Sequence, residues 1–258
     1  MEKQSGLTVA ACVLFIAAAA GVMQAQTYSV VYNFGTNVGD PYTPFYSGII
    51  AQGTDGNLYS ATESGGGAPL YGAAFGASPT TSGSLLMVSS FTGAPAGAYP
   101  YGDLTLGTDG NFYGTTTGGG SDNGPGTIFM MSPGGGVTTL YNFTGGSDGA
   151  CPYAPPVEGA DGNFYGTTQG YCAEYTSSSI YKITPPPSAT FTPLYSFNTS
   201  GGYAPIASLL LGTDGNFYGT TFFGGTGGAG EVFKITPAGE LTVLHSFDGK
   251  DGDRPAGS

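Results

Sequence analysis

A five-residue motif occurs four times along this chain of 258 residues, at intervals of 54, 52 and 53 residues. In each copy Asp-Gly-Asn is followed by Leu or Phe and then by Tyr. A repeat of about 50 residues is typical of propellers and solenoids, in which each unit buries its apolar face against the next unit. The repeated turn residues are Asp55, Gly56, Asn57, Asp109, Gly110, Asn111, Asp161, Gly162, Asn163, Asp214, Gly215 and Asn216.

Each repeat unit contains four short extended segments, which are clearest in the last unit at 206–212, 216–221, 231–236 and 241–247. The segments are rich in Phe, Tyr, Val, Ile and Thr and are bounded by turn-forming residues, which indicates strands. An Asp-Gly or Gly-Asn step supplies the positive φ that a tight two-residue hairpin requires between the first and second strands. The sequence therefore predicts an all-β fold, a β-propeller of four-stranded antiparallel blades with a period of about 53 residues.

The predicted propeller domain covers residues 26–258, with units at roughly 45–91, 101–143, 154–197 and 205–247. Residues 28–34 are expected to form a lone fourth strand, and a truncated fifth unit is expected from residue 248. We therefore expect an incomplete ring, part of a larger propeller. The alternative is a complete four-unit chain, closed into a small ring or left with open edges that associate.

The first 25 residues differ from the rest of the chain. Glu2 and Lys3 precede an uncharged apolar run from Leu7 to Val22, and a small residue, Ala25, stands at the expected cleavage point. This pattern predicts a signal peptide at residues 1–25. A single membrane anchor is the alternative, although the run is short for a span. We expect an exported protein, extracellular or at the cell surface, with no membrane span after cleavage.

Two cysteines remain after that cleavage, Cys151 and Cys172, both in the third unit. One lies in the loop that enters the predicted blade, and the other lies in the loop between its second and third strands. Those two loops emerge on the same face of a blade, so a disulfide is expected in an oxidising compartment. Two unpaired thiols are the alternative.

The charge balance excludes one class of partner. The chain has 17 acidic and 5 basic residues and a net charge of −12. Nucleic-acid binding is not expected, because five Lys and Arg residues are too few to neutralise a phosphate backbone.

The repeat resembles a known family. Residues 211–221, Gly224-Gly225, the segment 232–237 and the segment 241–247 look like the GloVer tandem repeat of exported bacterial proteins. The resemblance implies a repeat protein that carries a C-terminal surface anchor and has no established activity; no such anchor follows Phe247 here. A looser similarity to streptogramin-lyase-like repeats implies a propeller fold and no lyase activity.

No catalytic, cofactor or metal residues are predicted. The single histidine, His245, is expected to have a structural role in an outer strand. The run from Asp248 to Asp253 lacks the closing acid of a calcium loop and is expected to form a turn, with a weak calcium site as the alternative. Paired carboxylates for glycoside hydrolysis remain open among acids that nothing singles out: Asp103, Asp122, Glu158 and Glu174.

Ligand recognition is expected at four loops that vary between units, at 63–71, 117–125, 169–178 and 222–229. These loops hold or adjoin aromatic residues that either stack on sugar rings or pack beneath the loops: Tyr71, Tyr171, Tyr175, Phe222 and Phe223. The sequence thus favours a non-catalytic exported scaffold or binding module for an extracellular glycan or protein. A secreted hydrolase or lyase with its site at the ring mouth is the alternative.

Overall fold

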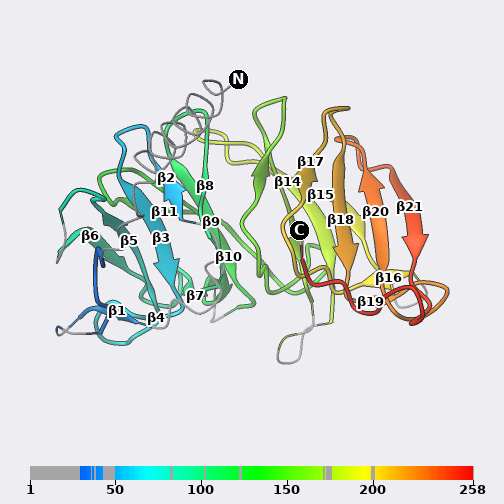
Figure 1. Cartoon of the computed structure of the whole chain (residues 1–258), viewed down its shortest axis with the longest axis horizontal. Coiled ribbons are helices and arrows are strands. Elements are labelled where there is room, and N and C mark those ends of the chain that lie inside the picture. The colour runs from blue at the N-terminus through cyan, green and yellow to red at the C-terminus, as the bar shows by residue number, and fades with distance from the viewer. Residues whose placement is uncertain are drawn as a thin grey trace, which may run out of the picture. The chain divides into compact units, whose positions relative to one another are not determined.

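The computed structural model describes residues 30–35, 37, 39–42, 50–81, 84–101, 103–121, 124–170, 172, 176–198 and 201–257. The predicted signal peptide at residues 1–25 lies outside them. The described residues form strands and no α-helix (Figure 1). None of their segments is therefore a helix of the length and apolarity that crossing a membrane requires.

Four antiparallel sheets confirm the predicted four-stranded blades, and the sheet of blade 2 also takes in a fifth strand, β7 (Ala98–Pro100). Blade 1 consists of β2 (Ala51–Gln52), β3 (Leu58–Thr62), β5 (Ala73–Ala77) and β6 (Leu85–Ser90). Blade 2 consists of β8 (Thr105–Leu106), β9 (Phe112–Gly118), β10 (Thr127–Met131) and β11 (Val137–Asn142). Blade 3 consists of β12 (Val157–Glu158), β13 (Phe164–Thr168), β14 (Ser179–Ile183) and β15 (Phe191–Ser196). Blade 4 consists of β17 (Leu210–Leu211), β18 (Phe217–Thr221), β20 (Glu231–Ile235) and β21 (Leu241–Ser246).

The segment that enters each blade bonds to the loop that follows the second strand of the same blade. Short strands make this contact in three units: β1 (Pro41–Tyr42) pairs with β4 (Ser64–Gly65), β7 (Ala98–Pro100) pairs with the end of β9, and β16 (Gly202–Tyr203) pairs with β19 (Phe223–Gly224). In the third unit the N–H of Gly170 donates to the carbonyl of Ala150 instead, at 2.8 Å. These contacts lie at the bottom of the view in Figure 1, at the end of the blades that carries the variable loops.

The apolar core lies between successive blades. Tyr59 packs against Phe112 with ring centroids 4.2 Å apart, and Tyr113 packs against Phe164 at 3.8 Å. Tyr165 repeats the contact with Phe217 at 4.2 Å. All six rings are almost fully buried. Burying rings of this size between neighbouring units is what makes blades of short, Gly-rich strands stable.

The predicted lone strand at residues 28–34 is not observed. Residues 28 and 29 lie outside the described residues, and residues 30–34 contain a bend at Val31 and the start of a turn at Phe34 but no strand. Phe34 nevertheless keeps the packing expected of its place in the repeat. Its ring meets Phe75 edge-on at 5.1 Å, as Phe91 meets Phe129 at 5.0 Å.

Candidate functional site

The four Asp-Gly-Asn turns share one geometry. In the third unit, the N–H of Gly162 donates to the carbonyl of Gly159 at 3.0 Å, and the N–H of Gly159 donates to the carbonyl of Asn163 at 2.8 Å. The loop therefore spans three residues, 160–162, and the expectation of a two-residue hairpin was wrong. Only the glycine takes positive φ, at 73°, because a type I turn followed by a left-handed residue suits the twist of the strands.

The aspartate of each turn organises the residues after it. One oxygen of Asp161 accepts from the backbone N–H of Asn163 at 3.2 Å. The other accepts from the Asn163 side chain at 2.7 Å and from the Tyr165 hydroxyl at 2.8 Å. Partial burial raises the pKa of Asp161, but these hydrogen bonds outweigh it, so the pKa lies below its ordinary value. Each oxygen is engaged within its own turn, which indicates a structural role.

The predicted cysteine pair is joined in the structure. Cys151 and Cys172 form a disulfide with their Cα atoms 6.3 Å apart. Cys151 lies in the segment that enters blade 3, and its N–H donates to the carbonyl of Pro125 in the loop of blade 2 at 2.7 Å. The disulfide therefore ties the variable loop 169–178 to a segment that already spans two blades.

The loop aromatics within the described residues pack against neighbouring segments. Tyr71 meets Tyr99 edge-on at 5.5 Å. Phe223 stacks on Tyr203 at 5.4 Å, and the guanidinium of Arg254 lies 5.5 Å from the Phe223 ring centroid. These rings therefore pack against neighbouring residues, which was one of the two expectations from the sequence. Tyr171 and Tyr175 lie outside the described residues.

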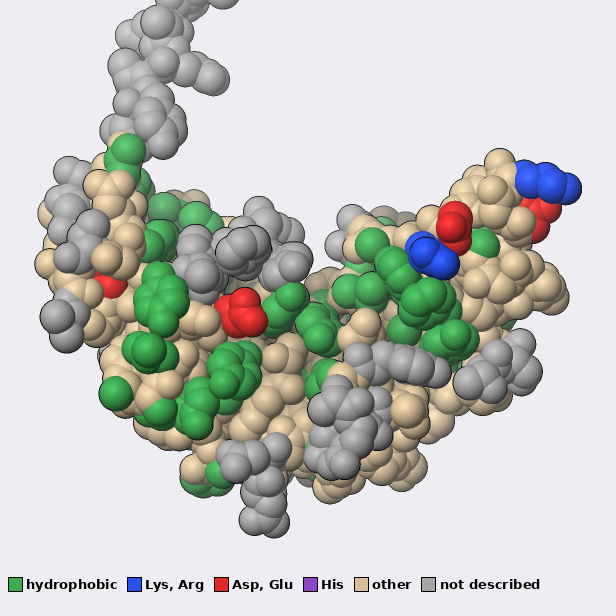
Figure 2. Space-filling model, turned by 90° about the horizontal axis from the view of Figure 1, so that it is seen from below, with side chains coloured by type: hydrophobic (Ala, Val, Ile, Leu, Met, Phe, Trp, Pro, Cys, Tyr) green, Lys and Arg blue, Asp and Glu red, His purple; other side chains and the backbone are tan. Residues whose placement is uncertain are grey.

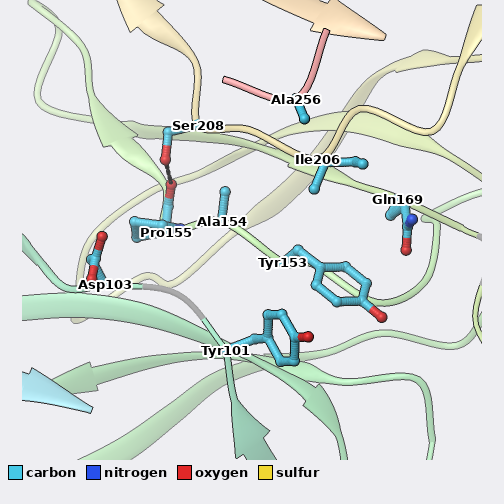
Figure 3. Close-up of a pocket in the computed structure, with 9 residues that line it drawn as sticks. All are labelled: Tyr101, Asp103, Tyr153, Ala154, Pro155, Gln169, Ile206, Ser208 and Ala256. Carbon is cyan, nitrogen blue, oxygen red and sulfur yellow. Dashed lines mark hydrogen bonds between the residues drawn. The ribbon is translucent and has the colours of Figure 1, made fainter. Parts of the chain in front are cut away.

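A pocket of about 380 Å³ opens among the segments that enter blades 2, 3 and 4 (Figure 3). We call it the tyrosine pocket. Its described lining consists of Tyr101, Asp103, Tyr153, Ala154, Pro155, Gln169, Ile206, Ser208 and Ala256. Tyr101 and Tyr153 meet edge-on with ring centroids 4.7 Å apart, so an aromatic corner forms one side of the pocket.

The pocket is built from equivalent positions of successive units. Tyr101, Tyr153, Ile206 and Ala256 each follow a proline. The residue before each of these four prolines has positive φ: 59° at Tyr99, 51° at Cys151, 56° at Ala204 and 51° at Arg254. The residue after each of these prolines lines the pocket. The recurring Pro-Tyr pairs at 100–101 and 152–153 were the sequence signal for this pocket, and sequence reasoning missed it.

The polar groups of the tyrosine pocket come from three blades. Gln169 begins the variable loop of blade 3, and its side-chain oxygen is buried with no hydrogen-bond partner among the described residues. The Ser208 hydroxyl donates to the carbonyl of Pro155 at 3.4 Å (Figure 3). Asp103 is the single acid of the described lining. The pocket thus combines an aromatic corner with amide, hydroxyl and carboxyl groups.

Of the carboxylates considered for catalysis, the two that the structure describes, Asp103 and Glu158, border different pockets. Glu158 borders another pocket, beside the Asp109 and Asp161 turns, and accepts from the backbone N–H and hydroxyl of Thr108 at 2.8 and 2.6 Å. Asp103 lines the tyrosine pocket instead. Asp122 and Glu174 lie outside the described residues. The two acids that can be placed therefore form no glycosidase pair.

His245 and the run after it form a self-contained turn. His245 lies in β21, and its Nε2 is 2.7 Å from an oxygen of Asp251. The carboxylate of Asp248 accepts from the N–H of Lys250 at 2.9 Å, and Asp251 accepts from the N–H of Asp248 at 3.0 Å. Within the described part of the chain, no three His, Cys, Asp or Glu side chains are grouped as metal ligands.

The chain is similar to one protein family along most of its length. The model of the Gloeobacter/Verrucomicrobia repeat matches residues 21–209 and 160–258. This match confirms the resemblance inferred from the recurring Asp-Gly-Asn units. No curated protein matches the sequence.

Solved structures with a similar fold are distant in sequence. A protein of Bacteroides uniformis provisionally assigned as a 6-phosphogluconolactonase is 14% identical with a TM-score of 0.51, covering 90% of this chain and 62% of its own. PorZ, a surface component of the type-IX secretion system of Porphyromonas gingivalis, is 13% identical with a TM-score of 0.50, covering 74% of this chain and 24% of its own. The extracellular domain of a hybrid two-component system of B. thetaiotaomicron is 8% identical with a TM-score of 0.49. That alignment covers 76% of this chain and 22% of the other. The chain thus spans less than two thirds of the length of these proteins. The likeness to the B. uniformis protein and to PorZ shows a propeller-type fold.

Proposed function

Since this chain belongs to the Gloeobacter/Verrucomicrobia repeat family, we propose that it is an exported, non-catalytic binding module whose tyrosine pocket takes a neutral glycan. The observation that carries the proposal is the edge-on pair of Tyr101 and Tyr153 beside Gln169, whose buried side-chain oxygen has no hydrogen-bond partner in the part of the chain that the structure describes. A sugar ring has an apolar C–H face and polar hydroxyls at its edge. An aromatic corner next to a hydrogen-bond acceptor complements both features.

Charge supports a neutral ligand over an acidic one. The protein carries a net charge of −12, and the charged group in the described lining of the pocket is the carboxyl of Asp103. Acidic polysaccharides would be repelled by both. On the face viewed in Figure 2, hydrophobic side chains gather and charged ones are sparse.

The hydrolase or lyase alternative has less support. A glycosidase needs two carboxylates about the scissile bond, and the described lining offers one. His245 is engaged by Asp251 beside β21 and does not line the pocket.

The test is calorimetric titration of the purified protein with neutral oligosaccharides, and with acidic ones for comparison. Tyr153→Ala is expected to weaken binding of a neutral oligosaccharide by at least about tenfold, since stacking with one ring is commonly a dominant contribution. Tyr42→Ala removes an exposed tyrosine that does not line the pocket and is the matched control. Unchanged binding by Tyr153→Ala, or binding of acidic oligosaccharides alone, would refute the proposal, and release of shortened sugars would favour the enzyme alternative.

Export is a separate part of the proposal. It is supported by the apolar leader of residues 1–25 and by the likeness to PorZ, a bacterial surface component. Expression in a bacterial host followed by mass measurement of the protein outside the cytoplasm is expected to find a chain that begins after Ala25. An intact leader on a protein confined to the cytoplasm would contradict export.

A further inference from the structure

Gln169 is an unrepeated residue at a repeated position. It follows the threonine at which the second strand of a blade pairs with the start of the third, and the residues at the same place in the other blades are Glu63, Thr117 and Phe222. Of these four residues, Gln169 is the one in the described lining of the tyrosine pocket. The backbone thus repeats while the side chain changes, which is the pattern of a residue used for recognition.

The carboxamide of Gln169 brings an open hydrogen-bonding site to the pocket (Figure 3). Its oxygen is buried and has no hydrogen-bond partner among the described residues. The hydroxyl of Ser208, which also lines the pocket, is by contrast engaged with the carbonyl of Pro155 at 3.4 Å. Buried polar groups are usually satisfied, so an amide left open in a pocket indicates a ligand that completes it. A carboxamide both accepts and donates, as a sugar hydroxyl does.

The backbone of Gln169 is tied to both segments that flank it in the pocket. Its N–H donates to the carbonyl of Cys151 at 3.1 Å, two residues before Tyr153. Its carbonyl accepts from the Ser178 hydroxyl at 2.5 Å. The oxygen of that hydroxyl in turn accepts from the N–H of Ala204, in the segment that enters blade 4, at 3.3 Å. These contacts set where the amide lies relative to the aromatic corner.

Cys151 is in turn held at three points. Its N–H donates to the carbonyl of Pro125 at 2.7 Å, its carbonyl accepts from Gln169, and its sulfur is bonded to Cys172, three residues after Gln169. The other units have a short strand pair at this place, and outside residues 1–25 the chain has no further cysteine. The disulfide therefore anchors Gln169 in the unit where a covalent link replaces the strand pair.

We propose that Gln169 determines which neutral sugar the tyrosine pocket selects, and that the disulfide between Cys151 and Cys172 positions it. The inference rests on the proposed function of the pocket. The ring of Tyr153 stacks on the apolar face that many sugars share, whereas the amide binds a hydroxyl that only some of them carry in the right place. A site built to hydrogen-bond a hydroxyl discriminates against a ligand that lacks it, because the amide is then left buried and unpaired.

Calorimetric titration with cellotetraose, mannotetraose and xylotetraose tests the role of Gln169. These sugars differ in the orientation or presence of hydroxyls around similar rings. The wild-type protein is expected to prefer one of them by at least about tenfold, and Gln169→Met is expected to lose most of that preference while still binding. Gln52→Met is the matched control, because Gln52 is exposed and lies outside the described lining of the pocket.

The outcomes separate this inference from the proposed function. Equal affinity of the wild type for the three sugars, or a preference that Gln169→Met retains, would refute the role of Gln169. The proposed function would then still stand if Tyr153→Ala weakens binding. A wild-type protein that binds no neutral oligosaccharide would refute both.

Replacing Cys151 and Cys172 together with Ser tests the role of the disulfide. This serine variant is expected to lose the preference to the same extent as Gln169→Met, and combining the two changes is expected to cost nothing further, because they act on one contact. Gly215→Val, in the turn between the first two strands of blade 4, is the control for lost stability. Weaker binding of all three sugars with the preference kept would mean that the disulfide acts through Tyr153, which contradicts the proposal.

Amide hydrogen exchange gives a readout that needs no ligand. The N–H of Gln169 is expected to exchange at least about tenfold faster in the serine variant than in the wild type. The N–H of Phe222 makes the equivalent bond in blade 4, to the carbonyl of Ala204 at 3.1 Å, and is expected to keep its rate. Equal acceleration of both amides, or of neither, would overturn the positioning role of the disulfide.

Discussion

Tyr113 holds two blades together through both ends of its side chain. Its ring stacks on Phe164 of blade 3 with centroids 3.8 Å apart, and its hydroxyl donates to Asp109 of its own turn at 2.7 Å. Burial, and then the hydrogen bond to Asp109, raises the pKa of Tyr113. The Tyr of the repeated motif therefore connects the turn of its own blade to the core between that blade and the next blade.

The first prediction concerns this coupling. Tyr113→Ala is expected to lower the free energy of unfolding by about 3–5 kcal/mol, because it leaves a cavity between two blades. Tyr218 occupies the same position in blade 4 but is partly exposed, and Tyr218→Ala is expected to have an effect below about 1 kcal/mol. Urea unfolding of both variants, at a protein concentration where the chain is monomeric, makes the comparison. Equal losses would contradict the role given to the contact between blades.

The second prediction concerns the left-handed glycine of the turn. Gly215 has a φ of 78° with open space around it, so a side chain there meets backbone strain and no clash. Gly215→Val is expected to destabilise the protein by about 1–2 kcal/mol, because a β-branched residue resists positive φ. Thermal unfolding of the variant and the wild type measures this destabilisation as a fall in melting temperature.

Gly134→Val is the control for that substitution. Gly134 lies in another exposed turn, lacks the positive φ and has room for a side chain. An equal fall in melting temperature for the two variants would rule out backbone strain as the cause.

The third prediction concerns acid stability. The pKa of the turn aspartates lies below the ordinary value in the folded protein, so these groups bind fewer protons folded than unfolded as the pH falls toward about 4. Their contribution to stability is present above the unfolded pKa and is lost as the pH falls through the folded pKa. Asp161→Asn is expected to unfold more easily at neutral pH and to lose less stability on acidification.

Urea unfolding at several pH values checks this expectation. Asp253→Asn, a change at an exposed acid outside the repeated turns, serves as the comparison. An acid profile of Asp161→Asn that matches the wild type would contradict the linkage.

The fourth prediction concerns the disulfide. A thiol assay on denatured protein that lacks residues 1–25 is expected to find no free cysteine without a reductant and two with one. Replacing Cys151 and Cys172 together with Ser is expected to lower the free energy of unfolding by about 3 kcal/mol, since the loop between them is of moderate length. Two titratable thiols in the untreated protein would rule out the disulfide.

Much of the fold was predictable because the interactions that make it are local and repeated. Asp161, Gly162 and Asn163 form their turn from side chains within three residues of one another, so the phrase itself specifies the hairpin. The sequence analysis expected a two-residue loop because it assigned the positive φ to a two-residue step. The hydrogen bond from the N–H of Gly159 to the carbonyl of Asn163 shows that the loop contains three residues.

The candidate site was less predictable because its residues come from different units. Tyr101, Gln169 and Ser208 are far apart in the sequence and line the same pocket only in the folded chain. The loop aromatics were expected to bind or to pack, and the pattern of residues alone could not separate the two outcomes. Tyr71 and Phe223 are occupied by neighbouring rings, a contact that depends on how blades pack.

The number of repeat units, the strands in each unit and the turn between the first two strands could be predicted from the amino-acid sequence. The reason is that a strand's alternation and a glycine's positive φ depend on neighbouring residues. The contacts between blades could be identified only in the folded chain: the stack of Tyr113 on Phe164, the pocket beside Tyr101 and Tyr153, and the exposed Leu210. Those contacts depend on the distance between neighbouring sheets. That distance arises from the packing of all the blades together and cannot be predicted from the sequence of any single unit.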